Sequence, residues 1–323
     1  MPFRLRLTEG PYWRRDAMSY HIVTIDSPRC SISCRDGQLA CTTPEGDRRL
    51  PIEDVATIII SSFSAQIHCQ LFLEAAKHGI AVIICEAFKP LSLVLPANRS
   101  TDTMLSRAQV ALDERKRERL WQMTVNAKCR NQALLAAQIA PDDPNVHALV
   151  SESASRKAHK EASCAKLFWR VFGRAAGQKD FTRDRSLPGL NSLLNYGYAI
   201  LLSTVLQKLL GVGLDPTFGL SHVQRERATP LGYDLMEPFR PFVDWRVAQW
   251  IRKEVAGPEG WAVTREFRRW VTGFPFERTE YLGFDLEVRG CIEGVVRGFR
   301  RAVFSNDPRF YKPWTPKSSK WVG

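Results

Sequence analysis

The chain has 323 residues, of which 44% are hydrophobic and 25% charged, a composition that excludes an intrinsically disordered protein. This length is enough for two hydrophobic cores. The net charge of +12 lies entirely in residues 98–323, with 36 basic and 24 acidic residues, whereas residues 1–97 hold ten of each. A local basic excess favours a polyanionic partner, usually nucleic acid, over the alternative of a merely solubilising surface.

The eight cysteines are scattered, and Cys30 and Cys34 have no second pair at zinc-binding spacing. The N-terminal sequence MPFRLRLTEGPYWRR does not resemble a secretory signal. The longest apolar run, around residues 196–206, is too short to span a membrane. We therefore expect a cytoplasmic protein with reduced cysteines, no structural zinc and no membrane partner.

Residues 1–97 predict a small β-domain with one helix. Short apolar or β-branched runs, separated by turn formers such as Asp36-Gly37, predict the strands. The helix is expected between Ser64 and Gly79, with Ile67 and Leu71 on its buried face. Residues 1–17 are compatible with an extension that precedes a true start at Met18, or with an ordinary N-terminal arm. The predicted strands are 21–26, 39–43, 56–61, 81–85 and 91–95.

Helical periodicity begins near residue 98, which predicts an all-helical domain over 98–304 and an α+β chain as a whole. Residues 305–323 are basic and contain Pro and Ser, so we expect a flexible tail. The predicted helices are 101–140, 145–175, 190–211, 232–254, 261–272 and 285–304.

Three segments of this helical part carry residues suited to chemistry. Glu161 is a lone acid in a basic neighbourhood, and taken by itself it is better explained as a surface glutamate paired with Lys157 or Lys160. His222 follows a glycine-containing turn, outside any apolar helix stripe, which favours a functional role more than an apolar stripe would, although a lone histidine is more often structural. These two residues are candidates for one site.

The third segment holds Asp234 and Glu237, which are three residues apart and therefore face the same way in a helical turn. Two like charges held together favour a cation between them. Arg240 lies three residues further on and could contact a phosphate oxygen. The alternative is the first turn of a helix that starts near Pro230, which explains Asp234 but not the whole pattern. Carboxylates with one imidazole suit Mg²⁺ or Mn²⁺, which are metals of phosphoryl transfer.

Taken together, GLDPTFGLSH (213–222) and YDLMEPFRPFVD (233–244) resemble the signature of the CRISPR-associated integrase, the larger universal spacer-adaptation protein. AKCRNQ (127–132) and LNSLLNYGYAIL (190–201) support the resemblance, which runs from about Tyr20 to Phe304. The stretch VIICEAFKPLSLVLP (82–96) is most similar to the versions in type II systems. Two positions depart from the family pattern, since Ala162 replaces the usual glycine and the loop before residue 190 lacks the common Asp-Pro.

The resemblance implies a catalytic metal held by Glu161, His222 and Glu237, with Asp234 as an additional acid. It implies metal-dependent endonuclease and integrase activity, in which the 3′-hydroxyl of new spacer DNA attacks a phosphodiester at a CRISPR repeat. It also implies a homodimer formed through the β-domain and a small ferredoxin-fold adaptation partner. Arg225, Arg227 and Arg240 are further candidates, as contacts to the DNA backbone. The alternatives are a transposon-type integrase of the same family and a non-catalytic nucleic-acid scaffold.

Overall fold

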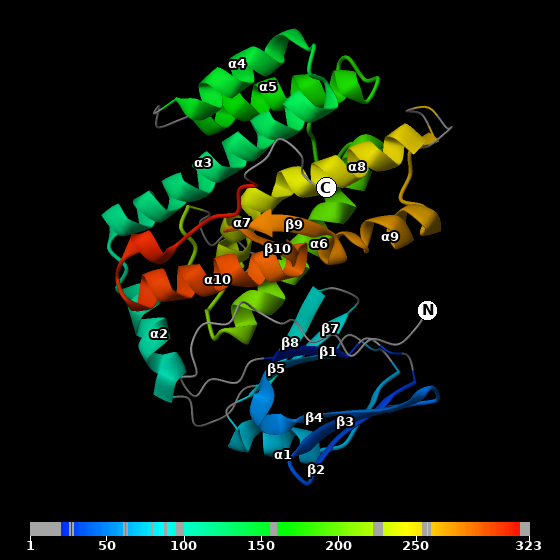
Figure 1. Ribbon diagram of the computed structural model, residues 1–323, viewed down its shortest axis with the longest axis vertical. Helices are drawn as coiled ribbons and strands as arrows, with labels where there is room; N and C mark the ends of the chain where they lie inside the picture. The colour runs from blue at the N-terminus through cyan, green and yellow to red at the C-terminus, as the bar shows by residue number, and fades with distance from the viewer. Residues whose placement is uncertain are drawn as a thin grey trace.

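A computed structural model describes residues 21–25, 27, 29–60, 62, 64–78, 80–86, 89–94, 100–155, 160–221, 229–253, 257 and 260–316. The predicted N-terminal extension, residues 1–17, lies outside these residues. The described chain is α+β, as expected: the strand-rich part lies at one end of the molecule and the helical part at the other (Figure 1).

The strand-rich part contains two four-stranded sheets. The first has the order β1-β5-β7-β8, in which β1, β5 and β7 are parallel and β8 is antiparallel to β7. The second has the order β4-β3-β2-β6. Its elements are β1 (His21–Ile25), β2 (Ser31–Arg35), β3 (Gln38–Thr43), β4 (Gly46–Pro51), β5 (Val55–Ile60), β6 (Gln66–Ile67), α1 (Gln70–Lys77), β7 (Ala81–Glu86) and β8 (Lys89–Val94).

All five strands predicted from the sequence are present, and β2, β4 and β6 are additional. The turn between β2 and β3 uses Asp36 and Gly37, both at positive φ (51° and 71°), as a two-residue hairpin turn requires. The helix is shorter than predicted because residues 66–67 pair with β2 as strand β6. Ser64 does not cap it; the Ser64 hydroxyl accepts a hydrogen bond from the backbone N–H of Arg29 at 2.8 Å.

The helical part contains α2 (Ser100–Val110), α3 (Glu114–Ile139), α4 (Pro144–Ala154), α5 (Lys160–Ala175), α6 (Leu190–Gly211), α7 (Pro230–Met236), the 3₁₀ turn η2 (Glu237–Phe239), α8 (Arg240–Lys253), α9 (Arg265–Val271) and α10 (Val288–Phe304). The helix predicted for 101–140 is two helices, because the Asp113 side chain accepts a hydrogen bond from the N–H of Lys116 at 2.9 Å and starts α3 there. The segment predicted as 145–175 is likewise divided into α4 and α5.

The prediction of an all-helical C-terminal domain is wrong at one place. Residues 278–287 form a hairpin of β9 (Arg278–Tyr281) and β10 (Phe284–Glu287). Leu282 and Gly283 form its turn, at φ 53° and 89°. Helical periodicity had been extended over β10, because four residues are too few to display a strand pattern before α10 begins.

The predicted flexible tail is wrong for residues 305–316. Tyr311 and Trp314 are fully buried, and the indole of Trp314 stacks on the ring of Phe239. Asn131 on α3 donates hydrogen bonds to the carbonyl oxygens of Trp314 (2.9 Å) and Pro238 (2.8 Å). Residues 305–316 are therefore held in place by buried aromatic side chains, although the composition of the segment is basic and contains Pro. Residues 317–323 lie outside the described part.

Each part has its own hydrophobic core, and α6 connects them. On β5, Ile58 and Ile60 point into the core of the strand-rich part, whereas Ile59 points the other way and packs near Ile83 and Leu210 of α6. By length and composition α6 could cross a membrane, but 67% of its apolar window is buried within the protein. Its apolar run is therefore explained as a core helix that joins the two parts.

Candidate functional site

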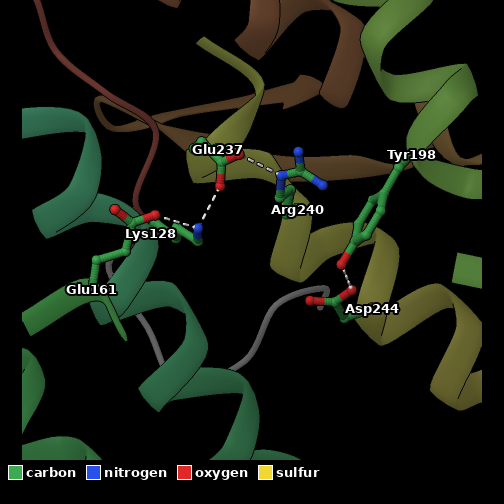
Figure 2. A network of polar contacts seen from close by, with 6 residues as sticks. All are labelled: Lys128, Glu161, Tyr198, Glu237, Arg240 and Asp244. Atoms are coloured by element: carbon green, nitrogen blue, oxygen red, sulfur yellow. Dashed lines mark hydrogen bonds and ion pairs between the residues drawn. The ribbon is translucent and has the colours of Figure 1, made fainter. Parts of the chain in front are cut away.

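Glu161 and Glu237, 76 residues apart in the sequence, meet at the side chain of one lysine (Figure 2). Lys128 lies in the middle of α3, Glu161 at the start of α5 and Glu237 at the first residue of η2. The Lys128 Nζ atom is 2.7 Å from Oε1 of Glu161 and 2.6 Å from Oε2 of Glu237. Three elements thus bring two carboxylates to a single positive charge.

Glu237 is the more deeply buried of the two carboxylates, with 4% of its side chain exposed against 35% for Glu161. Its Oε1 atom accepts a hydrogen bond from Nε of Arg240 at 2.7 Å. Burial would raise the pKa of Glu237, but the positive charges of Arg240 and Lys128 outweigh it and lower that pKa to about 2. The carboxylate is therefore ionised at every physiological pH.

Two further buried residues support Arg240. Its guanidinium lies over the ring of Tyr198 on α6, 4.6 Å from the ring centroid. The Tyr198 hydroxyl in turn donates a hydrogen bond to Oδ1 of Asp244 on α8 (Figure 2). A continuous chain of polar contacts therefore leads from Asp244 through Tyr198 and Arg240 to Glu237, and on through Lys128 to Glu161.

Asp244 is 1% exposed, and its Oδ2 atom has no hydrogen-bond partner. Burial raises the pKa of this carboxyl to about 7, although the hydrogen bond from Tyr198 and the charges of Arg183, Arg240 and Lys128 act in the opposite direction. Asp244 therefore changes its charge near neutral pH, whereas Glu237 does not.

Asp234 has partners other than those of Glu237. Its Oδ2 atom accepts hydrogen bonds from the backbone N–H groups of Leu220 (2.5 Å) and Ser221 (3.4 Å). Asp234 therefore fixes the backbone at Leu220 and Ser221, the last described residues before His222 in the sequence. His222, Arg225 and Arg227 themselves lie outside the described residues, and their predicted roles stay predictions.

The alternative for Glu161, a surface pair with Lys160, does not occur. Lys160 directs its Nζ atom to the carbonyl oxygens of Ser153 and Ser155, both at 2.8 Å. Lys157 lies outside the described residues. Arg240, predicted to contact DNA, has only 14% of its side chain exposed and is engaged with Glu237, so its contact with a phosphate stays a prediction.

The site fits a divalent cation in its donor chemistry. Two carboxylates converge on one positive charge, and the 2.6 Å contact of Lys128 leaves Oε2 of Glu237 without an aligned hydrogen bond. Carboxylate oxygens are the ligands that Mg²⁺ and Mn²⁺ prefer. Within the described part of the chain no three His, Cys, Asp or Glu residues cluster; the predicted third ligand, His222, falls outside it.

The sequence analysis missed Lys128, Tyr198 and Asp244 as parts of this site. All three lie in stretches that carried the family resemblance: Lys128 in AKCRNQ, Tyr198 in LNSLLNYGYAIL and Asp244 at the end of YDLMEPFRPFVD. The sequence therefore did contain a signal for these three residues, because each belongs to a motif of the family. The pairing of these residues across α3, α6 and α8 could not be seen, because it depends on how the helices pack.

Comparison with known proteins decides the family. The model of the family described as CRISPR associated protein Cas1 matches residues 23–270. The chain belongs to the Cas1 family. Among Cas1 relatives, the CRISPR-associated endonuclease Cas1 of Neisseria meningitidis is 32% identical over 203 residues, which cover 61% of this chain and 65% of that protein. A second Cas1 endonuclease, from Saccharolobus solfataricus, is 28% identical over 219 residues, or 64% of this chain and 68% of the relative.

Solved structures of similar fold cover nearly all of the Cas1 chain described here. A casposase bound to its integration product superposes with a TM-score of 0.68 at 21% identity, covering 90% of this chain and 98% of the other. A Cas1 protein from Thermotoga maritima gives a TM-score of 0.65 at 14% identity, with the same two coverages. The α+β architecture is thus that of the Cas1 fold.

Proposed function

We propose that this chain is a divalent-metal-dependent DNA integrase and endonuclease, which inserts new spacer DNA into a CRISPR array. The observation that carries the proposal is the convergence of Glu161 and Glu237 on one positive charge, with Lys128 Nζ within 2.7 Å of both. Membership of the Cas1 family supports it. The net positive charge of residues 98–323, which contain this site, supports DNA as the substrate.

The proposed reaction is a transesterification. The 3′-oxygen of the incoming DNA end attacks the phosphorus of a phosphodiester at the repeat boundary, and the hydroxyl proton passes to solvent. A new P–O3′ bond forms and the old one breaks, which leaves a free 3′-hydroxyl on the displaced end. A bound Mg²⁺ or Mn²⁺ supplies Lewis-acid stabilisation of the charge that develops on the phosphate.

The chain's own residues divide this work between them. Glu161, Glu237 and His222 are the proposed metal ligands. Asp234 holds the backbone at Leu220 and Ser221, and so orients the approach of His222. Arg240 fixes Glu237 by a 2.7 Å hydrogen bond and keeps it ionised.

The proposed partners are prespacer and repeat DNA, a second copy of this chain and a small ferredoxin-fold adaptation protein, all in the cytoplasm. One similar structure, at 15% identity and a TM-score of 0.66, is a partial Cas6-RT-Cas1–Cas2 complex. Support for a protein-facing surface comes from β8, an outer strand of its sheet, where Leu91 is 59% and Val94 38% exposed.

A strand-joining assay tests the proposal. Purified protein is incubated with a labelled duplex that bears 3′-hydroxyl ends and a target containing the host's CRISPR repeat, with Mn²⁺ or Mg²⁺ or with EDTA. Joining is expected with metal and not with EDTA. Glu161→Gln, Glu237→Gln and His222→Ala should each reduce it by about 100-fold or more, a loss of several kcal/mol of transition-state stabilisation.

Glu114→Gln is the matched control, because Glu114 is an exposed carboxylate on α3. It should retain full activity. A donor duplex that carries transposon ends, offered with a target that lacks the repeat, distinguishes the transposon-type alternative, for which the similar fold of the casposase is a reason. DNA binding with no joining under any metal condition would favour the non-catalytic scaffold instead.

A further inference from the structure

The position of Lys128 is unusual for a lysine on a long helix, because its ammonium group is held between two carboxylates from other elements. Its side chain is 13% exposed, and the two contacts are 2.6 and 2.7 Å long. Figure 2 shows Nζ between Glu161 on one side and Glu237 on the other. Nζ therefore stands at the point where any cation that joins these two carboxylates would have to lie.

The two oxygens of Glu237 differ in their hydrogen bonds. Oε1 of Glu237 accepts the hydrogen bond from Arg240 at 2.7 Å. Oε2, the oxygen nearest to Lys128, makes no aligned hydrogen bond. Oε2 is therefore the oxygen of Glu237 more open to a divalent cation while Arg240 remains in place, and it is the oxygen that Lys128 contacts.

Elementary electrostatics makes the two cations mutually exclusive. Mg²⁺ binds carboxylate oxygens at about 2.0–2.1 Å and tolerates little distortion. An ammonium group in contact with the same oxygens would lie against the metal, and the repulsion between their charges is weakly screened at a site so little exposed to water. Metal binding thus requires Nζ to leave Glu237, Glu161 or both.

We propose that Lys128 is an internal counter-cation, which competes with the divalent metal for Glu161 and Glu237 and thereby weakens metal binding. The inference rests on the proposed function, since it takes these carboxylates as metal ligands. Without metal, Lys128 neutralises the two converging carboxylates, and a metal ion must displace it to bind them both. The affinity of the site is reduced by the fraction of molecules in which Nζ occupies it.

A supporting role for Lys128 predicts the opposite change in metal affinity. If Lys128 stayed beside the carboxylates and oriented them for the metal, its loss would weaken metal binding, as loss of a supporting partner usually does. The sign of the change in metal affinity therefore separates a competitor from a supporting residue, and this readout is independent of DNA joining.

The experiment measures Mn²⁺ binding to the full chain by titration calorimetry and by electron paramagnetic resonance of free Mn²⁺. Lys128→Met should bind Mn²⁺ about tenfold more tightly than the wild type, which corresponds to an ammonium present at the site about 90% of the time. Lys128→Arg keeps the competing charge and should bind no more tightly than the wild type. Lys166→Met removes an exposed lysine from the helix that carries Glu161 and should leave the affinity unchanged.

Thermal unfolding provides a second measurement of metal binding, which can also be made on variants that are less stable than the wild type. Without metal, Lys128→Met and Lys128→Gln should both melt below the wild type, because Glu161 and Glu237 then lack the shared charge. Saturating Mn²⁺ should raise their melting temperatures by more than it raises that of the wild type. Unchanged or weaker Mn²⁺ binding by both variants would overturn the inference.

The Lys128→Met/Glu161→Gln double variant separates this inference from the proposed function. Tight Mn²⁺ binding by Lys128→Met that is lost in the double variant supports both. If Glu161→Gln abolishes binding but Lys128→Met does not tighten it, the metal site stands and the competition fails. If no Mn²⁺ binding depends on Glu161 or Glu237 in any background, the proposed function fails and the inference fails with it.

Discussion

The indole of Trp314 stacks on the ring of Phe239, with centroids 5.2 Å apart and planes inclined by 10°. Phe239 is the last residue of the turn that begins with Glu237. Asn131, three residues after Lys128 on α3, donates hydrogen bonds to the carbonyl oxygens of both Pro238 and Trp314. The C-terminal segment and α3 thus hold the Glu237 turn from two sides.

Trp314→Ala should remove this support. Truncation of a fully buried Trp typically costs about 3–5 kcal/mol of unfolding free energy, and denaturant unfolding would measure it. DNA joining should fall as well, because the turn that carries Glu237 loses its packing. Phe304→Ala is the control, since Phe304 is 46% exposed and should cost much less. Equal losses in the two variants would show that Trp314 does not clamp the turn.

The buried carboxyl of Asp244 predicts a pH dependence of stability. The pKa of Asp244 is about 7 in the folded protein, against an ordinary value of 3.8. The contribution of this carboxyl to the free energy of unfolding is therefore fully present below about pH 4 and is lost as the pH rises through 7. Asp244→Asn stays neutral and keeps an oxygen for Tyr198. Its stability relative to the wild type should therefore increase by up to about 4 kcal/mol between pH 4 and pH 8.

Urea unfolding at a series of pH values measures this difference. Glu237, whose lowered pKa acts in the opposite direction at acid pH, is present in both proteins and largely cancels. A pH-independent difference between Asp244→Asn and the wild type would contradict a raised pKa for Asp244.

Asp234→Asn tests the support of the His222 loop. The amide is nearly the same size but loses the negative charge that accepts hydrogen bonds from Leu220 and Ser221. Loss of such a supporting partner typically lowers metal affinity by about 10–100-fold, and Mn²⁺ titration would detect it. Asp142→Asn, on an exposed turn after α3, is the control. Wild-type affinity in Asp234→Asn would mean that this loop does not position a ligand.

The exposed apolar residues of β8 predict self-association of the strand-rich part. Leu91→Glu places a charge at a side chain that is 59% exposed, so it should leave the fold intact while opposing a protein contact there. Light scattering at micromolar concentration should show a dimer for the wild type and a larger monomer fraction for Leu91→Glu. A Leu73→Glu control, on α1, should stay dimeric. A monomeric wild type would reject the proposed dimer.

Much of the architecture could be predicted from sequence, because long periodic patterns are decisive. The helix at 190–211 was predicted with the bounds that the structure gives, and all five predicted strands exist. Short elements were missed where a tertiary partner decides the conformation: β6 has two residues and exists only by pairing with β2. The packed segment 305–316 was missed because its composition is polar, whereas its fold depends on Tyr311 and Trp314.

The candidate site was predictable as a set of acids but not as a geometry. Spacing placed Asp234 and Glu237 on one turn and therefore predicted a shared cation for that pair. That shared cation stays a prediction, whereas Glu161 and Glu237, which the family resemblance placed at one metal, meet at Lys128, and Asp234 accepts hydrogen bonds from a loop. Local spacing describes which side chains share a turn, whereas their partners come from α3 and α5, far away in sequence.

Helix α6 packs against both the helical part and the strand-rich part of the molecule. Tyr198, in the third turn of α6, belongs to the chain of contacts that ends at Glu161, and Leu210, in its last turn, packs by Ile59 and Ile83 of the first sheet. An α-helix is stiff over the roughly 18 Å that separate these positions. A displacement of that sheet that moves Leu210 would therefore also move Tyr198, because both lie on one stiff helix.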